Sequence, residues 1–244
     1  MNKLTIAAAI CAALCVSPAQ ARKKPEPTPA KPAPYASTYQ AIASAPVLIQ
    51  NATVLTGTGE RLDNADVLMQ DGKIQAVGKA LSPPGNAKII NGAGKWVTPG
   101  IIDVHSHLGV YANPGIQATS DGNEATNAVT ANVWAEHSVW PQDAGFAKAL
   151  AGGVTSMQIL PGSANLVGGR SVILKNVAAT TFQAMKFPDA PYGIKMACGE
   201  NPKRVYGEKG GPSTRMGNMA GYRAAFIGAE AYRRKWDAYE KGGR

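Results

Sequence analysis

The stretch GKWVTPGIIDVHSH, residues 94–107, decides the fold class of this chain. Its Thr98-Pro99-Gly100 turn separates a β-rich region from the residues that follow, because proline and glycine interrupt regular elements. After the turn, residues 101–104 form a short run, mostly apolar, that ends in His105-Ser106-His107. Side chains two residues apart on a strand point to the same face. The pattern therefore predicts two imidazoles side by side at the carboxyl end of a strand.

Upstream of this turn, the pattern is that of a small β domain covering residues 46–98. Asp71-Gly72 separates two apolar segments and is a strong signal for a tight hairpin. Other short strands are predicted on either side of it, with turn residues between them. The predicted strands are residues 47–49, 52–55, 67–70, 73–77, 88–90 and 95–97. Several short strands with frequent turns favour a sandwich-like sheet.

Downstream, residues 99–244 alternate between strand and helix patterns. Asp143 is a helix cap, and Gly152-Gly153 ends the predicted helix. Residues 108–141 are too long for an ordinary connection and are predicted to be functional or mobile. Further strands are predicted at 154–160, 171–174 and 192–197, and a helix at 219–241. This order is typical of an α/β fold with parallel strands.

The first 21 residues have the pattern of a secretory signal peptide. Lys3 precedes an apolar run at 4–16, and Ala19-Gln20-Ala21 forms a small-residue cleavage site. We therefore expect cleavage after Ala21 and export to the periplasm. Residues 22–45 are rich in proline and alanine and are predicted to be a linker. No other segment is apolar for long enough to cross a bilayer, so the mature form is expected to have no membrane span.

Composition excludes several classes of protein. Hydrophobic residues make up 45 % of the 244 residues, which rules out wholesale disorder. Lys and Arg number 25 against 16 Asp and Glu, for a net charge of +9. No recognisable nucleic-acid-binding module carries this charge, so a nucleic-acid partner is not expected. After cleavage one thiol is left, Cys198, which excludes a disulfide-stapled module.

The His-x-His pair is a candidate metal site. Two imidazoles on one face of a strand can each offer a nitrogen to one ion at about 2.0–2.1 Å. The strand end is also where α/β barrels place their active sites. Taken alone, the spacing also fits a pair of surface histidines. The remaining histidine, His137, lies between two tryptophans and is interpreted as a packing residue.

Several segments resemble the amidohydrolase superfamily. Residues 94–107 look like the segment that opens the barrel in those enzymes, and residues 67–74 resemble the small β domain that precedes it. Residues 149–156 resemble the joint between the first helix and the second strand. Residues 160–170 are similar to the imidazolonepropionase-like branch. The resemblance extends from about Val47 to the end of the chain.

This resemblance implies a distorted (β/α)8 TIM-type barrel that holds one or two divalent metals, usually zinc. His105 and His107 would be metal ligands, and a metal-activated water would hydrolyse a C–N bond in a small-molecule amide or cyclic amide. In the family, a Glu or a carboxylated Lys from a middle strand adds a ligand. Glu200 is preferred here over Lys195, because it follows the strand at the mouth of the barrel while Lys195 lies deeper.

Two further polar residues are assigned by position. Asp103 lies two residues before His105 and is a candidate to hold that histidine by a hydrogen bond; a structural carboxylate fits as well. Arg170, in a Gly-Gly-Arg turn, could bind a substrate carboxylate through its planar guanidinium or could be an ordinary surface arginine.

The pattern is also too short for the whole enzyme. A (β/α)8 barrel takes about 250 residues, so only three or four barrel strands are expected here. The chain has only three histidines, so the family's later-strand histidines have no counterpart, and neither has its final-strand catalytic Asp. One interpretation is the N-terminal part of an amidohydrolase whose remaining strands lie on a second chain or were lost by truncation; a homo-oligomer is the other partner considered. The alternatives are a catalytically silent half-barrel that binds metal or protein, and a small enzyme with a two-histidine site.

Overall fold

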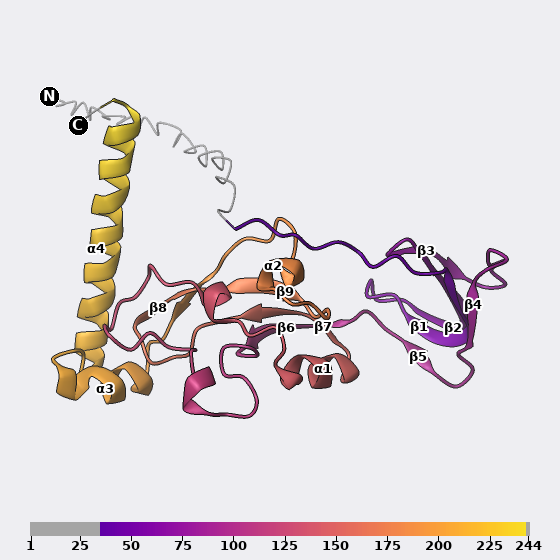
Figure 1. Ribbon diagram of the computed structural model, residues 1–244, viewed down its shortest axis with the longest axis horizontal. Helices are drawn as coiled ribbons and strands as arrows, with labels where there is room; N and C mark the ends of the chain where they lie inside the picture. Colours follow the sequence, from indigo (N-terminus) through magenta and orange to yellow (C-terminus); the bar gives the residue numbers. More distant parts are fainter. Residues whose placement is uncertain (1–34, 243–244) are drawn as a thin grey trace, which may run out of the picture. The chain divides into compact units, whose positions relative to one another are not determined.

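The structure is a computed structural model that describes residues 35–242 (Figure 1). The predicted signal peptide and the first part of the predicted linker lie outside the described residues. Both strands and helices follow residue 101, and a separate sheet precedes them. No helix within the described range is both long and apolar enough to span a membrane.

The first sheet is five-stranded, in the order β3-β2-β1-β4, with β5 also paired to β1. Asp71 and Gly72 form the β2–β3 turn with φ angles of 53° and 71°, a left-handed pair typical of tight hairpins. This hairpin confirms the sequence prediction. The strands are β1 (Val47–Leu55), β2 (Arg61–Gln70), β3 (Lys73–Gly78), β4 (Lys88–Asn91) and β5 (Trp96–Val97).

The predicted sandwich is wrong, because the described strands of this region form a single sheet. Residues 47–49 and 52–55, predicted as two strands, are the two halves of β1. A register irregularity separates them near Asn51, whose φ is 61°. Because of this bulge, the first half of β1 pairs with β4 and the second half with β5. The core of this region consists of Ala52, Val54, Ala65 and Val67.

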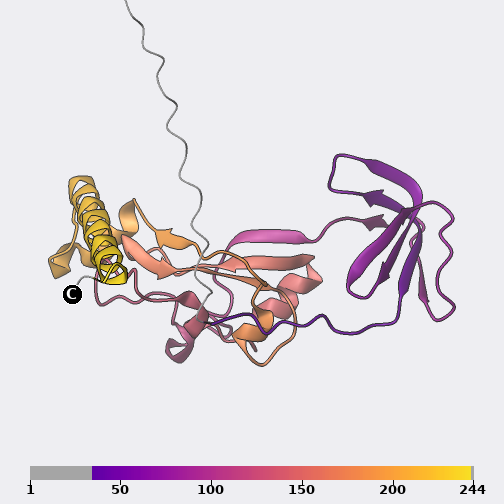
Figure 2. The ribbon, with the colours of Figure 1, turned by 90° about the horizontal axis from the view of Figure 1, so that it is seen from above.

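The second sheet carries the histidine pair. It contains β6 (Ile101–Ser106), β7 (Val154–Ile159) and β9 (Val172–Lys175), in the order β6-β7-β9 (Figure 2). β6 and β7 are parallel, as predicted. Gly100, just before β6, is required by close approach, since a Cβ there would lie 2.1 Å from Thr155 Oγ1. The glycine of the opening motif therefore allows these two strands to pair.

The prediction of parallel strands fails beyond β7. β9 is antiparallel to β7, and β8 (Val167–Arg170) forms a separate antiparallel pair with β10 (Ile194–Met196). The connection from β7 to β9 contains β8 but no helix, whereas a parallel return usually needs a helical crossover. The described residues therefore form an α/β fold with no closed barrel, and the predicted TIM-type arrangement is limited to the β6–β7 pair.

Two short helices lie beside the β6-β7-β9 sheet, one against β7 and one against β9 (Figure 1). The predicted helix after Asp143 is confirmed as α1 (Ala144–Ala151), which packs against β7. α2 (Phe182–Met185) and α3 (Glu200–Tyr206) are short, and α4 (Arg215–Glu240) includes the predicted C-terminal helix. The 3-10 turns are η1 (Gln117–Thr119), η2 (Ala135–Ser138) and η3 (Gly207–Lys209). The buried core consists of Val110, Ala135, Val139, Phe146, Met157, Ile159, Val172, Leu174 and Met185.

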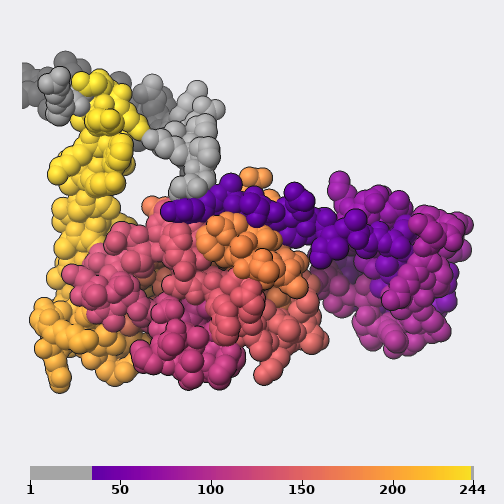
Figure 3. Space-filling view, viewed as in Figure 1, coloured from indigo at the N-terminus to yellow at the C-terminus, as the bar shows by residue number. Residues whose placement is uncertain are grey.

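Part of the predicted linker packs on the folded chain. Residues 35–39, called the strap from here on, lie over the orange region that contains α2 (Figure 3). The Thr38 amide donates to the carbonyl of Gln183 at 3.0 Å. Lys186 Nζ donates to the Tyr35 carbonyl at 2.5 Å and also forms a buried ion pair with Glu136 at 2.7 Å. A buried ion pair therefore holds the strap.

Candidate metal and substrate site

The two histidines of the His-x-His motif lie side by side at the carboxyl end of β6. Their ring centroids are 5.2 Å apart, and the ring planes meet at 80°. His105 is exposed and His107 is half-buried. This placement matches the strand geometry expected from the sequence. The two rings differ in what their nitrogens contact.

The ring of His107 is oriented by the residue that follows β7. His107 Nδ1 lies 2.8 Å from the carbonyl oxygen of Leu160. A carbonyl only accepts hydrogen bonds, so Nδ1 is the donor in this contact, and in the neutral ring the lone pair is then on Nε2. Metal-binding histidines in proteins are usually held by this kind of backbone contact. His107 is therefore ready to offer Nε2 to a ligand.

His105 Nε2 already has a protein neighbour. Lys195, on β10, places its Nζ 3.1 Å from this nitrogen. The side chain of Lys195 is largely buried, and burial lowers the pKa of its amine. The structure therefore brings together His105, His107 and Lys195 from two different sheets.

Glu200, the residue preferred from sequence as a third ligand, is not brought to the histidines. It is the first residue of helix α3, and its side chain is 73 % exposed. Its carboxylate pairs with Lys203 Nζ at 3.0 Å, one helical turn further on. A helix begins at this position where the sequence interpretation had only a strand end, and the carboxylate points to solvent. Of these two residues, the structure brings Lys195 and not Glu200 to the histidine pair.

Asp103 and Arg170 make contacts that fit the second option considered for each, a structural carboxylate and an exposed arginine. Asp103 Oδ1 accepts a hydrogen bond from the backbone amide of His105 at 3.0 Å, so it holds the strand end and not the imidazole. The Arg170 guanidinium lies over the ring of Trp134, 4.2 Å from its centroid. His137, in contrast, packs among aromatic rings as expected: Tyr35, Trp134 and Phe182.

Across residues 35–242, no group of three or more His, Cys, Asp or Glu side chains is close enough to hold one metal ion. Catalytic zinc sites usually have three protein ligands. The two histidines therefore supply part of such a set, and Lys195 is the neighbouring side chain that could complete it after carboxylation.

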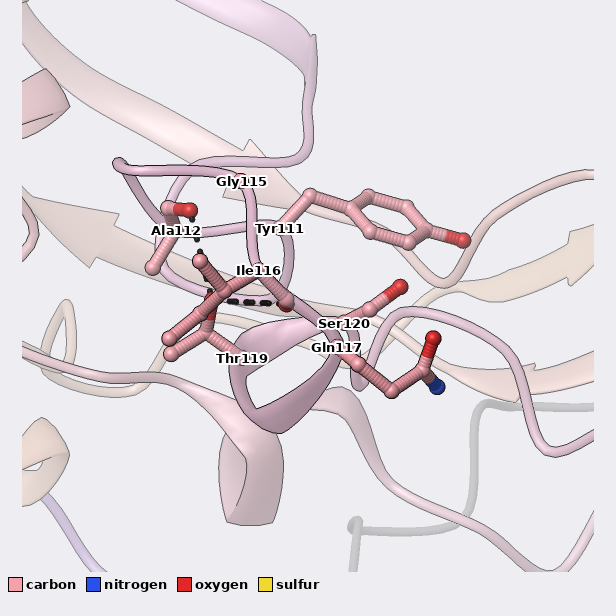
Figure 4. Close-up of a pocket in the computed structure, with 7 residues that line it drawn as sticks. All are labelled: Tyr111, Ala112, Gly115, Ile116, Gln117, Thr119 and Ser120. Carbon is pink, nitrogen blue, oxygen red and sulfur yellow. Dashed lines mark hydrogen bonds between the residues drawn. The ribbon is translucent and has the colours of Figure 1, made fainter.

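Two cavities lie in the segments that follow the histidine pair, and His107 lines one of them. One, of about 210 Å³, opens beside His107 and is lined on other sides by Tyr111, Asn123 and Arg204. The other, of about 250 Å³, lies within the loop of residues 111–120, where Thr119 Oγ1 contacts the carbonyls of Ala112 and Ile116 (Figure 4). Tyr111 lines both.

The sequence interpretation missed Tyr111, Asn123 and Arg204. Tyr111 follows His107 by four residues, and its ring centroid lies 5.7 Å from that of His107. Burial raises the pKa of its phenol, which donates to Asn123 Oδ1 at 2.6 Å. Asn123 lies in the long stretch that had been predicted to be functional or mobile. That prediction contained the relevant signal, but it could not single out a residue.

Two comparisons place the chain among known proteins, although no family model matches it. The amidohydrolase tasK of Hapsidospora irregularis is 35 % identical over 219 residues, which cover 79 % of this chain and 22 % of tasK. A crystal structure of an amidohydrolase from Thermotoga maritima MSB8 has a TM-score of 0.74 and 43 % identity. That match covers 81 % of this chain and 51 % of the Thermotoga chain. The matched part of this chain belongs to the amidohydrolase superfamily.

Other relatives are named dihydroorotase, dihydropyrimidinase or D-hydantoinase. A dihydroorotase of Trichlorobacter lovleyi is 27 % identical over 58 % of this chain and 28 % of that enzyme. The chain therefore spans about a fifth to a half of the length of these relatives. The relatives are hydrolases that act on C–N bonds, and this supports the class expected from residues 94–107.

Proposed function

We propose that this chain contributes the two-histidine part of a metal-dependent centre that hydrolyses a C–N bond in a small amide or cyclic amide. The observation that carries the proposal is the orientation of His107 by the Leu160 carbonyl, beside His105 and a cavity. If His107 only packed against its neighbours, nothing would favour leaving its Nε2 without a partner among the described residues, beside the ring of His105. Membership of the amidohydrolase superfamily supports the reaction class.

The donor set fits a divalent metal such as zinc. Imidazole nitrogen is a ligand that zinc prefers, and the contact of His107 Nδ1 with Leu160 leaves Nε2 as the nitrogen that can bind a metal. When bound, the ion would lower the pKa of a water molecule and polarise the carbonyl group of the amide. The chain's own residues hold the ligands in place: Asp103 fixes the backbone of His105, and Leu160 fixes the ring of His107.

Lys195 is proposed as the third contributor. Its Nζ lies next to His105 Nε2. Carboxylation of this amine would remove its positive charge and supply oxygen atoms that can bind the metal. An unmodified ammonium at 3.1 Å would instead repel a divalent ion held by His105. Glu200 is not proposed, because Lys203 already pairs with its carboxylate.

The other strands of the site are proposed to come from outside residues 35–242. β6 ends the sheet order β6-β7-β9 and so has an unpaired edge within the described sheet. Its side chains Ile102 and Val104 are 68 % and 69 % exposed. Exposed apolar edges of this kind favour pairing with further strands. Such strands could lie on the same polypeptide, on a second chain or on a second copy.

Zinc binding by the purified chain tests the centre. We expect His107→Ala and His105→Ala each to weaken zinc affinity by about tenfold or more, measured by competition with a chromophoric chelator. His137→Ala is the matched control, because this histidine packs among aromatic rings and should leave the affinity unchanged. Equal zinc affinity in the His105, His107 and His137 variants would contradict the proposal.

The role of the third contributor is tested separately. Lys195→Ala should weaken zinc binding and lose any bicarbonate-dependent gain in affinity, whereas Glu200→Gln should do neither. The reverse result would restore Glu200 as the ligand.

Export to the periplasm is also a proposal, and N-terminal sequencing of the fractionated protein should give Arg22 as the first residue.

A further inference from the structure

The cavity beside His107 has a wall that is rigid and polar. It is lined by His107, Tyr111, Asn123, Ser163, Asn201 and Arg204, together with three small or apolar residues. None of these is acidic. The cavity is about 210 Å³, below the range for drug-sized ligands, so it suits a small molecule or one end of a molecule.

The wall of this cavity is fixed by close packing and a hydrogen-bond chain. A Cβ at Gly162 would lie 2.1 Å from Asn123 Oδ1 and 2.5 Å from the Tyr111 hydroxyl, so this glycine lets the two side chains meet. Asn123 Nδ2 donates to Asn165 at 3.0 Å, and Asn165 in turn donates to the Tyr206 hydroxyl at 2.8 Å. Asn165 is completely buried. The loop and helix α3 are therefore tied together around the cavity.

The charge of the cavity comes from α3. Arg204 and Asn201 are three residues apart on this helix, so both reach the same side. Within the described residues, Arg204 forms no ion pair; its one hydrogen bond is a long contact of 3.5 Å with Asn201 Oδ1. The acidic residue of the same helix, Glu200, pairs with Lys203 instead. A guanidinium without a carboxylate partner therefore faces a cavity that contains no acid.

We propose that this cavity binds the carboxylate of the substrate, with Arg204 as the residue that recognises it. A guanidinium has a planar pair of donors that matches a carboxylate, and the Asn201 amide lies next to it. The substrate class is then a small amide or cyclic amide that carries a carboxylate. Its C–N bond lies toward the histidines and its anionic end toward α3. This inference rests on the proposed function, because it takes His105 and His107 as the reacting end.

Arg204 thus replaces Arg170 as the arginine that recognises substrate. Arg170 is engaged with the face of Trp134 and does not line the cavity. Arg170 follows two glycines, and Arg204 follows a polar segment. The sequence alone gives no reason to prefer Arg204 as the residue that binds a carboxylate.

A matched pair of probes tests the proposal without requiring turnover. The probes are 5-oxoproline and its neutral carboxamide, titrated into the full chain with and without zinc and followed by NMR. We expect the carboxylate to bind about tenfold more tightly than the carboxamide. In Arg204→Gln this ratio should fall to about one. Lys203→Gln removes the same charge from the same helix, outside the cavity, and should keep the wild-type ratio.

Three results would overturn the proposal: a ratio of one in the wild type, binding of neither probe up to its solubility limit, or equal losses in the Arg204 and Lys203 variants. Thermal unfolding of each variant checks that the exposed arginine has no structural role. The metal proposal fails by a different result, zinc affinity that His105→Ala and His107→Ala leave unchanged. A charge-dependent ratio can persist in that case, so the two failures are distinguishable.

Discussion

β6 and β7 are neighbouring parallel strands with similar apolar content, but their surroundings differ. Met157 and Ile159 of β7 are completely buried in the core. Ile102 and Val104 of β6 are largely exposed, and that edge of β6 is unpaired within the described sheet. The buried strand gives this part of the chain its stability, whereas the exposed strand carries the candidate ligands. The apolar pattern predicts burial of both strands. Within the described residues, Met157 and Ile159 of β7 are buried, whereas the apolar side chains of β6 are exposed.

The largest expected effect contrasts these two strands directly. Ile159→Ala should lower the free energy of unfolding by about 3 kcal/mol, because it leaves a cavity in a filled core. Val104→Ala, on the exposed strand, should change it by less than about 0.5 kcal/mol. Urea unfolding followed by circular dichroism measures both. Similar losses in the two variants would mean that β6 is buried in solution.

A somewhat smaller effect is expected at Asp143, which joins α1 to the segment after the histidines. Its carboxylate accepts from the backbone amides of Gly145, Gly109 and Asn113 at 2.8, 2.9 and 3.1 Å. Asp143→Ala removes a helix cap and leaves buried donors unpaired, at a cost of about 2 kcal/mol. Asp121→Ala, an exposed carboxylate in the nearby loop, is the control. Equal stability of the two variants would contradict the anchoring role.

Asp143 should also make the free energy of unfolding depend on pH in the acid range. Burial by itself would raise the pKa of Asp143, but the backbone hydrogen bonds from Gly145, Asn113 and Gly109 outweigh it and lower the pKa. A lowered pKa in the folded state contributes stability above the unfolded value of about 3.9, and this contribution is lost as the pH falls through the folded value. In Asp143→Asn, unfolding free energy should therefore depend less on pH below about 4. An unchanged acid limb in urea titrations would contradict this.

The smallest effect on stability is expected at the edge of β6. Ile102→Lys should leave the free energy of unfolding within about 0.5 kcal/mol of wild type but weaken self-association or pairing with another chain. Sedimentation velocity over a range of concentrations measures it. Ile42→Lys alters another exposed isoleucine that is not part of β6, and it should not change the association. The same loss in both variants would show that charge alone, and not the edge of β6, controls association.

The sequence predicts best where local chemistry decides the structure. The Asp71-Gly72 turn, the Asp143 cap and the pairing of residues 101–106 with 154–159 follow from turn, capping and strand patterns. The direction of β9 could not be read in the same way, because it depends on the absence of a helical crossover after β7. Periodicity identifies a strand without giving its orientation.

The candidate site shows the same difference between features set by local sequence and features set by tertiary contacts. The neighbouring positions of His105 and His107 follow from a two-residue repeat within one strand. Lys195 reaches His105 across 90 residues of sequence, and Glu200 is turned away by a helix that begins at that residue. Arg204 enters the cavity from that same helix. Contacts between distant segments are set by tertiary packing, which a single sequence does not reveal.

The contact between His107 and the Leu160 carbonyl makes the candidate site a reporter of strand register. The ring that should bind metal is held by the residue after the neighbouring strand, so the tautomer depends on how β6 lies beside β7. A slip of one residue would turn both histidines to the opposite face of the sheet. Metal affinity should then disappear while helices and core still give a folded signal. Zinc titration would thus detect a misregistered chain that circular dichroism cannot distinguish from the native one.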